Sequence, residues 1–173
     1  TTGVENNLIG ALAGDALTSG SYNVAVGHAA LSAATSSQGN SAVGYNALAV
    51  ATVGNYNVAM GYGALIANVN GDRSVGIGVS ALATQAPASA NTDMYNTAVG
   101  YEAGKSVTTG IQNTFIGGLA GNAVTTGRWN NVLGANALGA NTDGEENVAV
   151  GYNALSAADG GDGNVAMGNA AGY

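Results

Sequence analysis

The sequence predicts an all-β fold: a parallel β-solenoid (β-roll) of ten 17-residue coils, expected to assemble as a homotrimer. Three observations predict it: a pentapeptide that recurs ten times, a fixed spacing between its copies, and side chains too small for a conventional core. The 173 residues include 29 glycines and 34 alanines, but only one Phe, one Trp and one Pro. Burying side chains of this size contributes roughly 1–2 kcal/mol each, so a stack of equivalent coils is the economical way to form a core.

The repeated unit is Asn or Ser, any residue, a usually small residue, an aliphatic residue or Met, and then Gly. Successive copies are 17 residues apart, except for one interval of 22 between Gly78 and Gly100. We number each coil from the residue after this glycine, so that the pentapeptide occupies positions 13–17. The chain 1–173 is therefore predicted to be a single array, with a short inserted loop at about 86–90 that projects as a spacer. The glycines at position 17 are Gly10, Gly27, Gly44, Gly61, Gly78, Gly100, Gly117, Gly134, Gly151 and Gly168.

Each coil is expected to contain two short extended segments separated by turns. A glycine at position 10 of most coils suits a turn residue with positive φ. Because side chains alternate along a strand, positions 14 and 16, such as Val24 and Val26, are expected to fill the inside of the coil. Positions 13 and 15 then lie on the opposite face, where the Ala or Gly at position 15 lets another copy approach closely. Position 13 is Asn in nine coils and Ser74 in the tenth, which predicts a ladder of hydrogen-bonded amides.

A large apolar side chain stands at position 4 in some coils and at position 7 in others. Where position 4 is Leu, as at Leu31, position 7 is small or polar, as at Ala34. Where position 4 is Gly, position 7 becomes Leu17, Val107 or Val124. This exchange predicts one pocket per coil that either position fills, since a packed core conserves its volume.

Charge and composition narrow the classes of partner. Ten acidic and three basic residues give a net charge of −7 and a pI near 4.1, which argues against nucleic acid as a partner. No run of 18 apolar residues and no leader is apparent, so membrane insertion of this segment is not expected. The chain has no cysteine. Neither end resembles a polar cap, so we expect an interior stretch of a longer array, or a subunit whose ends continue into its neighbours.

The pentapeptide, its following Tyr-Asn-Ala-Leu (45–48 and 152–155) and the variant form at 103–117 resemble two related groups of repeats. One is the head β-roll of trimeric autotransporter adhesins, whose repeats are shorter. The closer resemblance is to the trimeric β-roll repeats in the shafts of bacteriophage tail fibres, including proteins that end in an endosialidase-type chaperone. It covers nearly the whole chain. The resemblance implies an elongated trimeric shaft for host attachment, with a chaperone or receptor-binding tip elsewhere in the gene product.

No residues form a convincing catalytic, cofactor-binding or metal-binding set. The single histidine, His28, shares position 1 with Tyr45 and Tyr62, which predicts a lateral stack that serves packing. The stretch 159–163 contains a glycine-aspartate turn, but a calcium roll would repeat it in every coil. Aromatic residues at position 12 are candidates for surface recognition, with shielding of the coil edge as the simpler interpretation. They are Tyr22, Tyr56, Tyr95 and Trp129.

The leading hypothesis is a non-enzymatic shaft or adhesion module of a fibrous surface protein, namely a phage tail fibre used in host attachment. It would reside in the virion or on a cell surface, and its partners would be copies of itself and a host receptor or glycan. The first alternative is a bacterial adhesin or a self-assembling, head-to-tail extracellular filament. The second is an ice- or carbohydrate-binding solenoid, for which threonines recur at position 8. These are Thr18, Thr35, Thr52, Thr108, Thr125 and Thr142.

Overall fold

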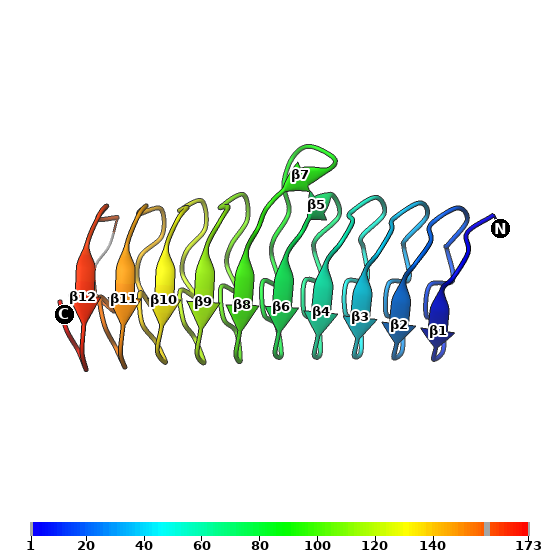
Figure 1. Ribbon diagram of the computed structural model, residues 1–173. Helices are drawn as coiled ribbons and strands as arrows, with labels where there is room; N and C mark the ends of the chain where they lie inside the picture. Colours follow the sequence, from blue (N-terminus) through cyan, green and yellow to red (C-terminus); the bar gives the residue numbers. More distant parts are fainter. Residues whose placement is uncertain (1, 158–159, 173) are drawn as a thin grey trace.

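A computed structural model describes residues 2–157 and 160–172. Ten three-residue strands stack in parallel, one per coil, and form one continuous sheet along the molecule (Figure 1). Paired residues lie one repeat apart, as in Val24 opposite Ser41, and the register is kept across the 22-residue interval. The parallel solenoid with a 17-residue period is therefore confirmed. The strands are β1 (Asn7–Ile9), β2 (Val24–Val26), β3 (Ser41–Val43), β4 (Val58–Met60), β6 (Val75–Ile77), β8 (Thr97–Val99), β9 (Thr114–Ile116), β10 (Asn131–Leu133), β11 (Val148–Val150) and β12 (Val165–Met167).

The second extended segment does not form a strand in every coil. Among the described residues, only β5 (Gly71–Asp72) and β7 (Thr92–Asp93) pair there, as a separate two-stranded sheet beside the insertion. Elsewhere a single carbonyl at position 8 accepts hydrogen bonds from several consecutive amides, as Thr35 does from Thr18, Ser19 and Gly20. The expectation of two strands per coil is therefore wrong, because the narrow turn bends the backbone away from a regular ladder.

The strand faces are reversed relative to the sequence prediction. Position 15 is buried, as at Ala25 and Ala42, whereas Val24 and Val26 at positions 14 and 16 lie on the outside and are partly exposed. A 17-residue coil encloses a narrow space, and the position-13 amide takes part of it. Alternation then turns position 15 inward with it. The Ala/Gly face that was expected to contact other copies is therefore the interior of the solenoid.

The asparagine ladder is confirmed, inside the molecule. We use this name for the position-13 column from Asn6 to Asn164. Along it the backbone N–H of each successive residue donates to the Asn Oδ1 one coil earlier at 2.9–3.1 Å, except at Asn96, which follows Ser74. Most Nδ2 groups also donate to the position-10 carbonyl of the next coil at 2.8–2.9 Å. Satisfied amides can be buried, since an unpaired buried polar group costs about 1–3 kcal/mol.

One residue repairs the ladder where Ser74 interrupts it. The buried side chain of Gln85, at position 7 of the next coil, receives a hydrogen bond from Asn96 Nδ2 at 2.9 Å. Its amide also contacts the Ser74 hydroxyl at 3.0 and 3.2 Å. Gln85 therefore connects the two halves of the ladder. It is the only Gln at position 7, opposite the only Ser at position 13, so the sequence carried a signal for this pair.

The core pocket predicted from positions 4 and 7 is confirmed and has a third source. Leu31 fills it from position 4, while Val107 and Val124 fill it from position 7, all fully buried. Phe115 enters from position 15 in addition. Its ring lies over Gly121, where an added Cβ would be 2.2 Å from ring carbons.

The turns depend on left-handed backbone at positions 2, 4 and 12. The leucines at position 4 share this conformation, with φ near +50° at Leu31 and Leu48, although it costs L-residues roughly 1–2 kcal/mol each. The glycines at position 17 have φ between +127° and +148°, and, except at Gly168 in the last coil, the backbone one coil on leaves no space for a Cβ. At position 10 the predicted positive φ is wrong. Most of these glycines are required because a Cβ would clash with the carbonyl of the next coil; a Cβ built on Gly110, for example, would lie 2.3 Å from the Gly127 oxygen.

The insertion projects from the roll between β6 and β8 (Figure 1). Residues 88–91 are exposed, but Pro87 and Met94 are buried, and Met94 packs against the backbone of Gly71. The loop is thus anchored at both ends. Within 2–157 and 160–172 the structure has no helix that is long and apolar enough to cross a bilayer.

Candidate functional site

The charged and aromatic side chains lie on the outer surface of the solenoid, and each type is confined to particular positions of the coil. In all ten coils, the strand positions 13–16, the glycine at 17 and the next coil's position 1 contain no Asp, Glu, Lys or Arg. The charges lie at other turns, with Arg73, Lys105 and Arg128 paired to Asp93, Glu102 and Glu145. The surface is therefore divided into a charged side and an uncharged side.

The aromatic ridge, as we call Tyr22, Tyr56, Tyr95 and Trp129, runs along the turn just before the sheet. Its four side chains are 39–57% exposed, and each has φ between +50° and +63°. The turn thus holds the rings outside the coil. The structure brings the predicted recognition residues onto one edge, although other side chains separate them.

Cations of the same chain occupy much of the ridge. The Arg73 guanidinium lies 5.5 Å from the ring centroid of Tyr56 and 6.0 Å from that of Tyr95. Arg128 lies 4.4 Å from the Trp129 ring centroid, and Trp129 Nε1 donates to Gln112 Oε1. Ring faces used in this way are less available to stack on a ligand. The arrangement favours shielding of the coil edge, and recognition by the ridge stays a prediction.

Tyr95 and Arg73 share a further partner from the inserted loop. Arg73 forms an ion pair with Asp93, and the Tyr95 hydroxyl donates to Asp93 Oδ2 at 3.2 Å. Asn91 of the same loop accepts from Asn55 Nδ2 at 3.1 Å. The insertion therefore positions the central part of the ridge, which the sequence did not indicate.

The predicted stack at position 1 is confirmed. The rings of His28 and Tyr45 are 5.1 Å apart with an interplanar angle of 17°, and those of Tyr45 and Tyr62 are 5.2 Å apart at 6°. The in-register coils impose this spacing. Further along the same column, Tyr101 donates a hydrogen bond to Glu102, which raises the pKa of the tyrosine, while Lys105 lowers the pKa of the Glu102 carboxyl.

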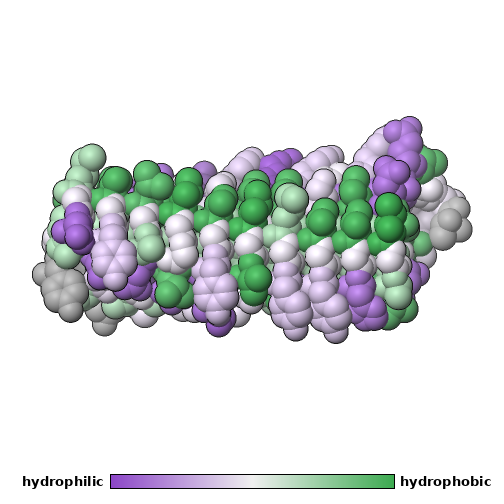
Figure 2. Space-filling view, turned by 90° about the horizontal axis from the view of Figure 1, so that it is seen from below, coloured by the Kyte–Doolittle hydropathy of each residue, from purple (hydrophilic) through white to green (hydrophobic). Residues whose placement is uncertain are grey.

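Beside this column lies the apolar stripe, the name we give to the position-16 side chains. It was expected in the core, but it forms a continuous hydrophobic row on the outside along the whole roll (Figure 2). Leu133 is 51% exposed and Met60 43%. The signal in the sequence was that this position is aliphatic or Met in every coil. The stripe comprises Ile9, Val26, Val43, Met60, Ile77, Val99, Ile116, Leu133, Val150 and Met167.

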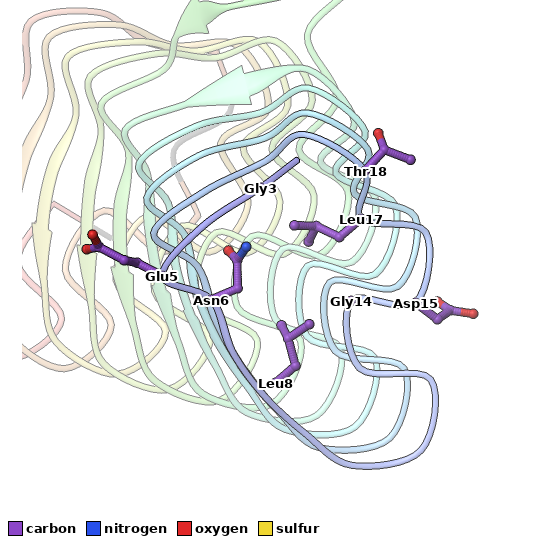
Figure 3. Close-up of a pocket in the computed structure, with 8 residues that line it drawn as sticks. All are labelled: Gly3, Glu5, Asn6, Leu8, Gly14, Asp15, Leu17 and Thr18. Carbon is purple, nitrogen blue, oxygen red and sulfur yellow. The ribbon is translucent and has the colours of Figure 1, made fainter. Parts of the chain in front are cut away.

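A hollow of about 410 Å³ lies at the first coil (Figure 3). Leu8, Leu17 and Asn6 point into it, whereas Glu5 and Asp15 point away. Leu8, Leu17 and Asn6 occupy positions 15, 7 and 13, which form the core of the other coils. The hollow is thus the core space of the coil stack at its first coil. The two acidic side chains beside it, Glu5 and Asp15, point away from it.

Most threonines of the column at position 8 use their hydroxyls within the protein. Thr18 and Thr125 donate to the position-8 carbonyl one coil on at 2.9 Å, and Thr35 and Thr108 do so at 3.2 Å. Donors satisfied by the backbone are not offered to an outside lattice. Of the candidate calcium turn 159–163, Asp159 lies outside the described residues, and within the described part no three His, Cys, Asp or Glu gather as metal ligands.

Comparison with protein-family models, with curated proteins and with solved structures finds no match for this chain.

Proposed function

We propose that this chain is a non-enzymatic structural shaft in a fibrous surface protein, and specifically part of a tail fibre with which a bacteriophage attaches to its host. The observation that carries the proposal is the asparagine ladder, whose hydrogen bonds join successive coils from Asn6 to Asn164 and whose members from Asn23 to Asn147 are buried. Such a rod resists bending because any bend must lengthen these bonds. Its role is to hold an adhesive tip away from the particle, at an extracellular or virion surface.

The dimensions of the rod provide a physical test. Ten strands at a spacing of ~4.8 Å give a rod of ~48 Å with a constant cross-section. Small-angle X-ray scattering should give an elongated particle of that length, or a multiple of it where copies join end to end. A compact, near-spherical particle would contradict the proposed shaft.

The biological assignment has its own test, which is the gene around this segment and its neighbours. A chaperone domain after the repeats and neighbouring virion genes support a tail fibre. A membrane-anchor barrel would instead indicate a bacterial adhesin, and matching ends without a further domain would indicate a self-assembling filament. All three classes use the same rod.

Carbohydrate binding is the second candidate, because the aromatic ridge exposes four rings on one edge. Trp129→Ala should abolish binding on a glycan array, while Tyr152→Ala, on a different turn, should leave it intact. Equal binding by both variants would remove the ridge from consideration. Ice binding is disfavoured because threonine hydroxyls at position 8 donate to the backbone of the next coil, and we expect no thermal hysteresis.

A further inference from the structure

We propose that Tyr45 and Tyr62 form an oxidative modification site, at which a one-electron oxidant joins the two phenol rings into an intrachain dityrosine. Both residues occupy position 1, in neighbouring coils, and lie 17 residues apart in the sequence. Their ring centroids are 5.2 Å apart, and the rings are parallel to within 6°. The product is a covalent bond between two coils on the outside of the rod. It goes beyond the proposed shaft, because it depends on the fold and not on what the rod carries.

Both rings are accessible to an oxidant in solution. Tyr45 is 46% exposed and Tyr62 is 59% exposed, and the two side chains lie outside the core. Each ring can therefore turn about its own side-chain bonds without disturbing the packing of the coil. Such a turn takes the rings out of the parallel stack and brings the edge of one against the edge of the other, where the carbons that couple are located.

The column at position 1 contains one pair of adjacent tyrosines. His28 covers the other side of Tyr45 at 5.1 Å, and Val79 separates Tyr62 from Tyr101. Two coils without an aromatic residue at this position lie between Tyr101 and the last tyrosine of the column, Tyr152. Within the part of the chain that the structure describes, no other two tyrosine rings stack. The site is therefore specific to the third and fourth strands, β3 and β4.

The tyrosines of the aromatic ridge are kept apart. Arg73 lies at position 12 of the coil between Tyr56 and Tyr95, and its guanidinium is 5.5 and 6.0 Å from their ring centroids. Gly39 occupies the same position between Tyr22 and Tyr56. Exposure alone therefore does not make a pair, since the ridge tyrosines are exposed as well.

The reaction needs an oxidant, for which we name a haem peroxidase with hydrogen peroxide. Each phenol gives up one electron and one proton and becomes a phenoxyl radical. The two radicals join by a carbon–carbon bond between ring carbons ortho to their oxygens. The hydrogen on each of these carbons is then lost as a proton while each oxygen regains one, which restores both aromatic rings. One hydrogen peroxide takes up the two electrons and two protons and becomes two waters.

Proximity favours coupling within the chain. Two reactants that are held next to each other react in a unimolecular step, which is faster than an encounter between separate molecules. The bond closes a loop of the chain between Tyr45 and Tyr62, and a closed loop restricts the unfolded chain. The oxidised protein should therefore unfold at a higher urea concentration than the untreated protein.

Peroxidase treatment followed by trypsin digestion tests the proposal. Arg73, Lys105 and Arg128 are the only basic residues, so Tyr45 and Tyr62 fall in the same peptide, 1–73. The intrachain product should give this peptide the fluorescence of dityrosine and a mass lower by two hydrogen atoms. A link between copies would instead join two such peptides. A link to Tyr95 or Tyr101 would join it to the peptide 74–105.

Phenylalanine substitutions identify the reacting pair. Tyr45→Phe keeps the ring and the stack but removes the phenol, so it should abolish the product without affecting the fold. The matched control is Tyr152→Phe, because Tyr152 occupies the same position and is 59% exposed, like Tyr62. This control should give the same product in peptide 1–73 as the wild type.

A third variant moves the pair along the column. Val79 follows Tyr62 at position 1 and is 43% exposed. Tyr45→Phe with Val79→Tyr should therefore regain dityrosine, now as a link that joins peptide 1–73 to peptide 74–105. Three results would each overturn the proposal: no dityrosine in a wild type treated under conditions that couple free tyrosine, an equal yield from Tyr45→Phe, or links between copies alone.

Discussion

Replacing Gln85 with alanine tests the repair of the asparagine ladder. The substitution removes one of the two acceptors of Asn96 Nδ2, leaving the Gly110 carbonyl, and it removes both contacts with the Ser74 hydroxyl. All three side chains are fully buried, so the groups left without a partner are not in contact with bulk solvent. Lost hydrogen bonds of about 1 kcal/mol each and an unpaired buried hydroxyl together lower the expected free energy of unfolding by about 3 kcal/mol. Urea denaturation followed by circular dichroism measures this change.

A second substitution should reverse the loss. Ser74→Asn alone is expected to destabilise, because the larger amide needs the space of the Gln85 side chain, now 3.0 Å from the Ser74 hydroxyl. Ser74→Asn with Gln85→Ala recreates the combination of Asn40 and Ala51, which are also 11 residues apart. The double variant should therefore be more stable than either single variant. If its loss equals the sum of the two single losses, Gln85 does not complete the ladder.

Three further predictions concern the turns, the core and the surface. Gly117→Ala should lower the free energy of unfolding by about 2–4 kcal/mol, because φ is +129° and a Cβ would lie 2.7 Å from the backbone of the next coil. Gly118→Ala is the control: a Cβ there would have no atom within 4 Å, so the free energy of unfolding should change by less than about 0.5 kcal/mol in the same urea assay. Phe115→Ala should cost about 3–5 kcal/mol, since its ring is fully buried, and an unchanged denaturation midpoint would contradict the packing described. Lys105→Ala should raise the pKa of Glu102 towards its usual range, as followed by NMR titration. Because the folded pKa of Glu102 is lowered, any stability from the pair is present above its unfolded pKa and is lost as pH falls through the folded value.

The period of a repeat can be predicted correctly while its buried and exposed strand faces are assigned the wrong way round, as happened here. Alternation along Val24–Val26 specifies two faces, but it does not say which one is inside. The sequence feature that does indicate the buried face is less obvious than this alternation. The large residues at position 15, Leu8, Phe115 and Val132, occur in coils next to a glycine at position 4, as Gly14 and Gly121 illustrate. Such compensation is expected only between side chains that share the core.

Surface features were only partly predictable. The stack of His28 on Tyr45 follows from register alone, because equivalent positions in successive coils must lie side by side. The contacts of Arg73 with the ridge and with Asp93 depend on how the inserted loop folds back. That path is set by tertiary contacts, since the insertion has no counterpart in the other coils.

The sequence alone determined the period, the parallel register and the amide column, because each needs only that the same residue types return every 17 positions. It also determined that positions 4 and 7 share one space, since their sizes vary inversely. The tertiary structure decided which face is buried, because only the closed coil limits the interior to an amide, small residues and one larger side chain. It likewise placed the aliphatic column of position 16 on the outside.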